Sequence, residues 1–131
     1  MFWTLIAIAR LLLGGAFVAF AVRNYVVNVP RLTGLLETSR LLQEYPPLKL
    51  PTTPRNVVLF GIAMQFVAGL LTAVGLFPAL GGLLMIAFLI VATLLFHPAW
   101  LYPAEERAPH TVAVLMNTSL VGAFLMSIAV G

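Results

Sequence analysis

The sequence has no cysteine and very little charge, and both shortages limit what the protein can be. Charged residues make up 8% of the 131 residues, whereas a soluble domain of this size carries about a quarter. Without cysteine there is no disulfide, no thiolate nucleophile and no cysteine-ligated iron–sulfur cluster. Seven basic and four acidic residues give a net charge of +3, too little for a nucleic-acid surface. This composition suits a lipid bilayer as the solvent.

Hydrophobic residues make up 62% of the chain and gather in four long segments. A helix needs about 20 apolar residues to cross the hydrocarbon core of a bilayer. Four segments come close to this length, at about 3–22, 57–76, 79–96 and 111–130. Only a short turn separates the second segment from the third, so these two form a hairpin. We therefore predict an all-α membrane protein, one domain over 1–131, with four transmembrane helices in an antiparallel bundle.

The segment 23–56 is the longest predicted loop, and its pattern is not that of a plain linker. Between Arg31 and Glu44 the leucines recur near helical spacing while the charged residues lie mostly elsewhere, which predicts an amphipathic helix in the membrane interface. Pro46 and Pro47 then end this helix. A second, shorter polar loop is expected at 97–110.

Basic residues indicate the orientation in the membrane. Six of the seven lie in the two predicted long loops, namely Arg23, Arg31, Arg40, Lys49, Arg55 and Arg107. Cytoplasmic loops are enriched in Lys and Arg, so we expect these loops to face the cytoplasm and both termini to face outward. The predicted location is the cytoplasmic membrane of a bacterium, where lipids are the first partners.

Arg10 is the one basic residue inside a predicted span, and no Asp or Glu lies in any of the four. An ionised side chain in this position is costly and needs an explanation. Arg10 and Arg23 are 13 residues apart, about 20 Å along a helix, so the two could snorkel outward and bracket the hydrocarbon core. The other interpretation is that Arg10 binds an acidic group of a partner subunit, a lipid or a quinone headgroup.

Small and amide side chains predict where the helices pack. A stripe with a spacing of four residues runs along the second predicted helix, formed by Gly61, Gln65, Gly69 and Ala73. Such stripes allow helix backbones to approach closely in lipid. In the fourth predicted helix, Asn117 and Gly122 offer a matching surface. We expect a buried hydrogen bond between Gln65 and Asn117.

The third predicted helix ends in the sequence FHPAW, which contains His97. A structural interpretation is complete in itself, because Pro98 ends the helix, Trp100 suits the interface and an imidazole can meet the last carbonyls. His110 opens the fourth predicted helix on the same side, so the two imidazoles can approach each other. His97, Arg10 and Trp100 are the candidates for contacting a quinone or lipid headgroup, whereas a metal or haem ligand is the weakest interpretation. No catalytic residue and no metal site is predicted.

Four blocks of residues also point to a known family. They are Arg10, Leu13 and Gly14; Gly69 and Gly75; Ala92, Thr93, Phe96, His97, Pro98 and Trp100; and Asn117, Leu120 and Gly122. This combination resembles the DoxX family, whose members are small four-helix membrane proteins. The resemblance implies a link to quinone-dependent redox complexes. Three positions depart from the family pattern: Gln65 replaces a glutamate, Phe77 and Pro78 replace a polar and basic pair, and Met116 replaces a lysine.

The departures from the family pattern remove ionisable groups and favour a role without catalysis. We therefore expect a non-catalytic accessory subunit that stabilises a larger redox or photosynthetic membrane complex, with other membrane subunits as partners and no cofactor of its own. The alternatives are a quinone-binding subunit of an oxidoreductase and a small transporter. A homo-oligomer is compatible with the apolar outer surface, and an enzymatic role stays open.

Overall fold

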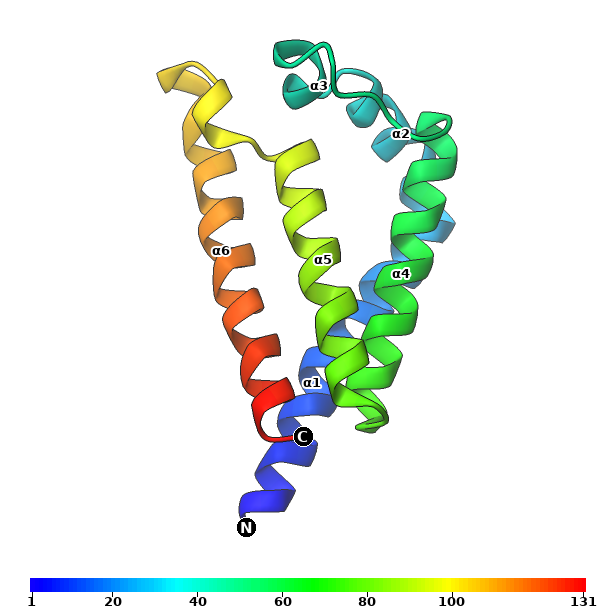
Figure 1. Ribbon diagram of the computed structural model, residues 1–131, viewed down its shortest axis with the longest axis vertical. Coiled ribbons are helices and arrows are strands. Elements are labelled where there is room, and N and C mark those ends of the chain that lie inside the picture. Colours follow the sequence, from blue (N-terminus) through cyan, green and yellow to red (C-terminus); the bar gives the residue numbers. More distant parts are fainter.

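The computed structural model describes residues 1–131 and consists of helices without strands (Figure 1). Four helices are long and apolar enough to cross a membrane, which confirms the predicted all-α membrane fold. They pack in the order α1, α4, α5 and α6, each against the next. Their bounds are α1 Phe2–Arg23, α4 Pro54–Val74, α5 Pro78–Phe96 and α6 Ala104–Ala129.

The first helix does not end where the charge of Arg23 suggests. A π-helical turn, Asn24–Asn28, continues α1 into α2, Val29–Glu37, and α3, Arg40–Glu44, follows after a break. The predicted amphipathic helix is therefore two helices, because the chain leaves helical geometry at Thr38 and Ser39. The Ser39 hydroxyl donates to the Leu95 carbonyl at 2.7 Å and attaches this break to α5.

The hairpin of α4 and α5 is defined by its caps. The Thr53 hydroxyl accepts a hydrogen bond from the Asn56 amide at 3.3 Å, which satisfies one free donor at the start of α4. Gly75 ends the helix in the left-handed conformation (φ 69°) that glycine adopts without strain. Pro78 then occupies the first turn of α5, where its missing N–H has no cost. The turn is as tight as the sequence predicts.

The fourth membrane helix begins earlier than predicted, at Ala104 instead of about 111. Glu105 and Glu106 lie in its first turn, where carboxylates interact favourably with the helix dipole. Pro109 is accommodated inside the helix. The predicted polar loop is therefore only a short connection that includes the 3-10 turn Ala99–Leu101.

The two ends of the bundle differ in packing (Figure 1). One end, called the closed end here, contains Gly14, Phe17, Gly69, Gly82 and Phe124. There α1 and α4 are so close that a Cβ on Gly14 would overlap the backbone of α4. The rings of Phe17 and Phe124 meet edge to face with centroids 5.5 Å apart, joining α1 to α6. Toward the other end, the pair α5 and α6 separates from α1 and α4.

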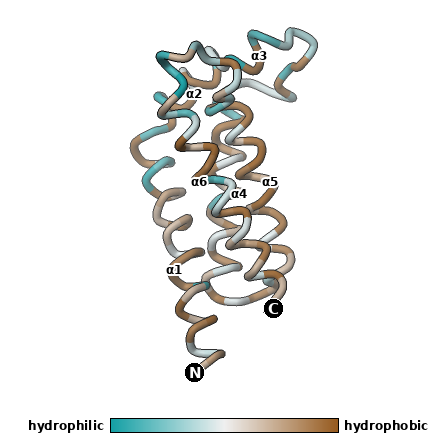
Figure 2. The backbone as a smooth tube through the Cα atoms, turned by 90° about the vertical axis from the view of Figure 1, so that its left-hand side faces the viewer, coloured by the Kyte–Doolittle hydropathy of each residue, from teal (hydrophilic) through white to brown (hydrophobic).

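The open end (Leu36, Ser39, His97, Tyr102 and His110) is covered by α2 and α3. Leu36 is fully buried and packs with Ala21, Val58 and Ile62 in a second apolar cluster. Figure 2 shows that the long helices are mainly hydrophobic and that the hydrophilic stretches gather at this covered end. The polar groups of the chain therefore lie mostly on one side of the bilayer.

Candidate functional site

A large cavity lies inside the open end. Its volume is about 800 Å³, and residues from α1, α2, α4, α5 and α6 line it. Most of its lining residues are hydrophobic, such as Phe17 and Leu89, and the lining also includes the charged Arg31 and the buried amide of Gln65. This is the usual composition of a site for a small organic molecule.

Two histidines meet at the loop side of the cavity. His97 follows the last residue of α5, where its amide bonds the Thr93 carbonyl at 2.8 Å, and His110 projects from the first turns of α6. The two Nδ1 atoms are 3.1 Å apart. At this distance one Nδ1 carries the proton and the other accepts it, since two lone pairs or two N–H groups would repel. The predicted approach of the two imidazoles is confirmed.

Three further side chains support this histidine pair. The ring of Tyr102 stacks on His110 with centroids 3.8 Å apart and planes at 11°. Arg40 lies above the Tyr102 ring, 5.0 Å from its centroid, and forms an ion pair of 3.7 Å with Glu106. Both partners of that pair are partly exposed, so it adds little stability. Its position nevertheless connects α3 to the start of α6. No sequence pattern indicates this cluster, because its members come from separate segments of the chain.

Asn117 lies on the same wall but does not bond Gln65. Its side-chain amide donates to the Thr93 hydroxyl at 2.8 Å, and this hydroxyl donates to the Leu89 carbonyl at 2.6 Å. The predicted hydrogen bond between Gln65 and Asn117 is therefore wrong. The physical reason is the order of the helices, since α6 packs against α5 and not against α4.

Gln65 finds its partner on the first helix instead. The Asn24 amide donates to the Gln65 side-chain oxygen at 3.4 Å, and Asn28 donates to Asn24 at 3.0 Å. Gln65 is 5% exposed, and the π-helical turn supplies the amide that this buried group needs. Asn24 and Asn28 are four residues apart, so they share one face of a helix that continues beyond Arg23. This spacing is the sequence signal for the Asn28–Asn24 bond, and it requires that the first helix is predicted to extend past Arg23.

The other two predicted headgroup contacts, Arg10 and Trp100, do not line this cavity. Arg10 lies at the closed end, where its guanidinium donates to the Ser127 carbonyl at 2.9 Å and to the Ser127 hydroxyl at 3.4 Å. It therefore binds the last turn of α6, whose free carbonyls attract a cation. Trp100 is 51% exposed and does not line the cavity. Of the three candidates, only His97 belongs to this site.

The predicted packing stripe divides between two neighbours. Gly69 and Ala73 lie against Gly14 of α1, whereas Gly61 lies near the Phe88 ring of α5. Gly122 has open space around it on the outer surface of α6, so its predicted packing role is not found within the chain.

The two arginines of the predicted bracket lie toward opposite ends of the bundle. Arg10 lies at one end of the bundle, beside the turn between α4 and α5. Arg23 directly precedes Asn24, which bonds Gln65 near the middle of α4. Ala21, two residues before Arg23, packs with Leu36 and Val58, so Arg23 lies toward the open end and the bracket stays a prediction.

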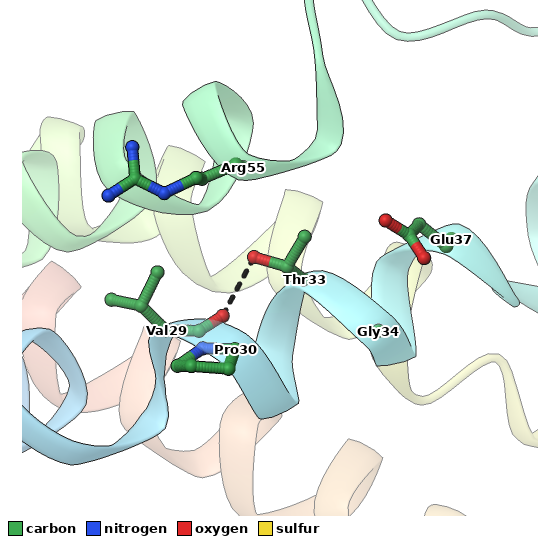
Figure 3. Close-up of a pocket in the computed structure, with 6 residues that line it drawn as sticks. All are labelled: Val29, Pro30, Thr33, Gly34, Glu37 and Arg55. Carbon is green, nitrogen blue, oxygen red and sulfur yellow. Dashed lines mark hydrogen bonds between the residues drawn. The ribbon is translucent and has the colours of Figure 1, made fainter.

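A second, smaller hollow lies outside the bundle, between α2 and the start of α4. Figure 3 shows Arg55 on α4 and Glu37 on α2 at its two sides, with the Thr33 hydroxyl bonded to the Val29 carbonyl between them. Its volume is about 400 Å³, and it shares no residue with the large cavity. Both charged side chains are exposed to solvent, so the large cavity is the candidate site.

Comparison with known proteins places the chain in a family. The family model named DoxX matches residues 5–98, which is most of the chain. The chain belongs to the DoxX family. Comparisons with curated proteins and with solved structures give no match.

The DoxX match includes part of the residues that line the candidate site. It covers the first three membrane helices and ends at Pro98, directly after His97. His110 and Asn117, which complete the polar wall of the cavity, lie on α6 and outside the match. This DoxX protein is thus an integral membrane protein, and its candidate site includes residues inside and outside the matched segment.

Proposed function

We propose that this DoxX protein binds a quinone of the bacterial cytoplasmic membrane, as a quinone-binding subunit of an oxidoreductase. The observation that supports the proposal is the histidine pair at one side of a mainly apolar cavity of about 800 Å³. Cavities of roughly 300–1,000 Å³ with a few polar groups are typical of small-molecule sites.

The polarity of the cavity fits the two parts of a quinone. His97, His110 and Tyr102 lie at the covered, loop side, whereas Phe17 and Leu89 lie deeper in the bundle. A quinone has a polar ring and an apolar isoprenoid tail, so its ring would meet the histidines and its tail would extend along the apolar part.

The cavity also opens toward the lipid-facing surface, where such a tail would extend. Phe60 on α4 and Val91 on α5 line it and are 71% and 53% exposed. Residues that line a cavity and also face outward mark a place where it reaches the lipid-facing surface. A long tail would therefore extend into the bilayer without unfolding the bundle.

The histidine pair offers hydrogen bonds to both redox forms of a quinone. In a neutral pair, the imidazole that carries its proton on Nδ1 has a free lone pair on Nε2, and the other imidazole has an Nε2–H. The Nε2–H donates to a quinone carbonyl, and the lone pair accepts from a hydroquinone hydroxyl. These side chains bind and orient the ring, and the electrons would come from a partner subunit.

Tryptophan fluorescence tests the proposal. The chain has two tryptophans, and Trp3→Phe leaves only Trp100, three residues from His97. We expect a short-chain ubiquinone analogue to quench Trp100 with saturation, and His97→Ala to weaken binding about five- to tenfold through one lost hydrogen bond.

The matched control is Trp100→Phe, which leaves Trp3 at the closed end as the only reporter. Quinone dissolved in the detergent would quench Trp3 without saturation. If Trp100 behaves in the same way, or if His97→Ala binds as tightly as the parent, the quinone proposal is refuted.

The outer surface of α6 favours a second role, the accessory subunit of a larger membrane complex. Only Phe124 and Ser127 of this 26-residue helix are buried, whereas Leu115 and Met126 are 62% and 70% exposed. Native mass spectrometry after gentle extraction tests this role. Recovery of the chain within a larger assembly supports it, and recovery of a lone chain contradicts it.

A further inference from the structure

The side-chain amide of Gln65 finds only part of its hydrogen bonds within the protein. Its oxygen accepts from the Asn24 side chain at 3.4 Å, and this is the only side-chain hydrogen bond that Gln65 forms. Its nitrogen carries two further N–H groups. Gln65 is 5% exposed, and a buried amide donor without an acceptor is costly. The nitrogen therefore needs an acceptor that the chain does not supply.

The neighbouring asparagines determine which end of this amide is free. Asn28 donates to the Asn24 side-chain oxygen at 3.0 Å, which leaves the Asn24 nitrogen to face Gln65. Because this nitrogen only donates, Gln65 must meet it with its oxygen, and the Gln65 nitrogen is turned away from Asn24. Both asparagines belong to the π-helical turn, an irregularity that is frequent at functional sites. The turn thus sets the orientation of the amide.

The free nitrogen of Gln65 is open to the large cavity. Gln65 lines this cavity. Among the residues that are not exposed, only Thr72 has a side-chain polar atom that is fully covered and without a partner. The Gln65 nitrogen is therefore not fully covered and touches open space. Because the bundle covers almost all of this side chain, that space is the cavity.

The surroundings of Gln65 select the kind of acceptor. The turn of α4 before it contributes Gly61, Ile62 and Met64 to the cavity lining, whose side chains are apolar or absent. No Asp or Glu lines the cavity, so the acceptor comes from the bound molecule. An uncharged amide offsets little of the cost of burying an anion. A neutral carbonyl oxygen is the group that fits this donor.

Gln65 lies deeper in the bundle than the histidine pair. It is near the middle of α4, whereas His97 follows the last residue of α5. These helices form a hairpin, so the start of α4 and the end of α5 lie at the same end of the bundle. From Pro54, the first residue of α4, to Gln65 the helix rises by about 16 Å. The amide is therefore a second polar position of the cavity.

We propose that Gln65 binds the oxidised form of the quinone, with its side-chain nitrogen donating to a ring carbonyl at this second position. The inference rests on the proposed quinone function. A quinone ring has only acceptors, and the free part of Gln65 only donates because its oxygen is bonded to Asn24. A hydroquinone has hydroxyl donors, which find an acceptor at the histidine pair and gain less at Gln65. Gln65 thus distinguishes the two redox forms.

Nuclear magnetic resonance of the glutamine side chains tests this contact directly. The sequence has two glutamines, Gln65 and the exposed Gln43 of α3, which serves as an internal control. The chain is prepared in detergent with isotope-labelled glutamine amides. We expect a short-chain ubiquinone analogue to move the Gln65 amide signal downfield with saturation and to leave the Gln43 signal in place. Its hydroquinone should move the Gln65 signal far less.

The variant Gln65→Met tests the same contact as an affinity. It keeps the length of the side chain and removes the donor, so the oxidised analogue should bind about fivefold more weakly. Binding of the hydroquinone should be nearly unchanged. Gln43→Met is the matched control and should bind both forms as the parent does; it also assigns the remaining signal to Gln65. If Gln65→Met does not fold, the signals of the parent chain decide.

Three results overturn the proposal: a Gln65 signal that stays in place while quenching of Trp100 saturates, equal movement of both glutamine signals, or equal movement of the Gln65 signal with both redox forms. The first result leaves quinone binding at the histidine pair intact, because Trp100 reports it separately. Quenching of Trp100 without saturation refutes the quinone function itself, and this inference with it.

Discussion

The closed and open ends of this bundle are held together in different ways. At the closed end, the backbones of α1 and α4 touch at Gly14 and Gly69, and aromatic rings connect α1 to α6. At the open end, an apolar cluster around Leu36 and polar contacts such as the His97–His110 pair join the helices around a cavity. Helix association in lipid depends on close packing, so we infer that the closed end stabilises the bundle while the open end stays available for a ligand.

The largest effect should come from a side chain added at the closed end. In Gly14→Val, the new Cβ would overlap the backbone of Gly69 and Ala73. We expect a loss of about 3 kcal/mol in the free energy of unfolding, the upper range for overpacking. Gly15→Val is the matched control, because its Cβ would meet open space. Denaturant titration in detergent measures both, and equal stability of the two variants would contradict the close contact.

Removal of an aromatic ring should have the next largest effect. Phe124 is fully buried and packs on Phe17. We expect Phe124→Ala to cost about 3 kcal/mol, the lower range for such a truncation in a protein core. Leu125→Ala, at a neighbouring position that is 54% exposed, should cost far less. If both variants unfold at the same denaturant concentration, the aromatic contact does not join α1 to α6.

Arg10→Leu should have a more local effect at the same end. It removes the guanidinium that bonds Ser127 in the last turn of α6. We expect a loss of about 1 to 2 kcal/mol and faster amide hydrogen exchange at Ile128 to Val130. Unchanged exchange there would show that the cap is not formed in the membrane.

The smallest effect is expected at the open end. Asn117→Leu breaks the hydrogen bond to Thr93, which in lipid contributes about 0.6 kcal/mol on average. Thr93→Val should cost a similar amount, and the double variant should cost little more than either one. Additive losses in this double-mutant cycle would mean that the two side chains do not interact.

The sequence predicted the number and pairing of the membrane helices because apolar segments of about 20 residues have the length that a membrane-spanning helix needs. It failed where a helix end depends on tertiary contacts. A charged residue such as Arg23 is typical of a helix end, yet packing of α1 on α4 and the π-helical turn extend the helix beyond it. The early start of α6 was missed because Glu105 and Glu106 read as loop residues.

The candidate site was predicted only in part, and the reason is the order of the helices. His97 and His110 were expected on one side because they flank the same short connection. Gln65 and Asn117 were paired wrongly, since nothing in the sequence says that α4 contacts α1 and α5 while α6 contacts α5. The Tyr102 and Arg40 contacts depend on how α3 folds over the bundle.

Photochemical labelling with an azido-quinone in native membranes tests the central proposal most directly. The account predicts saturable labelling of cavity segments on α4, α5 and α6, including His97 and its neighbours, and loss of label when excess unmodified quinone competes. Labelling that competition does not reduce, or that falls on outward residues such as Leu115 and Met126, would contradict a quinone site in the open end.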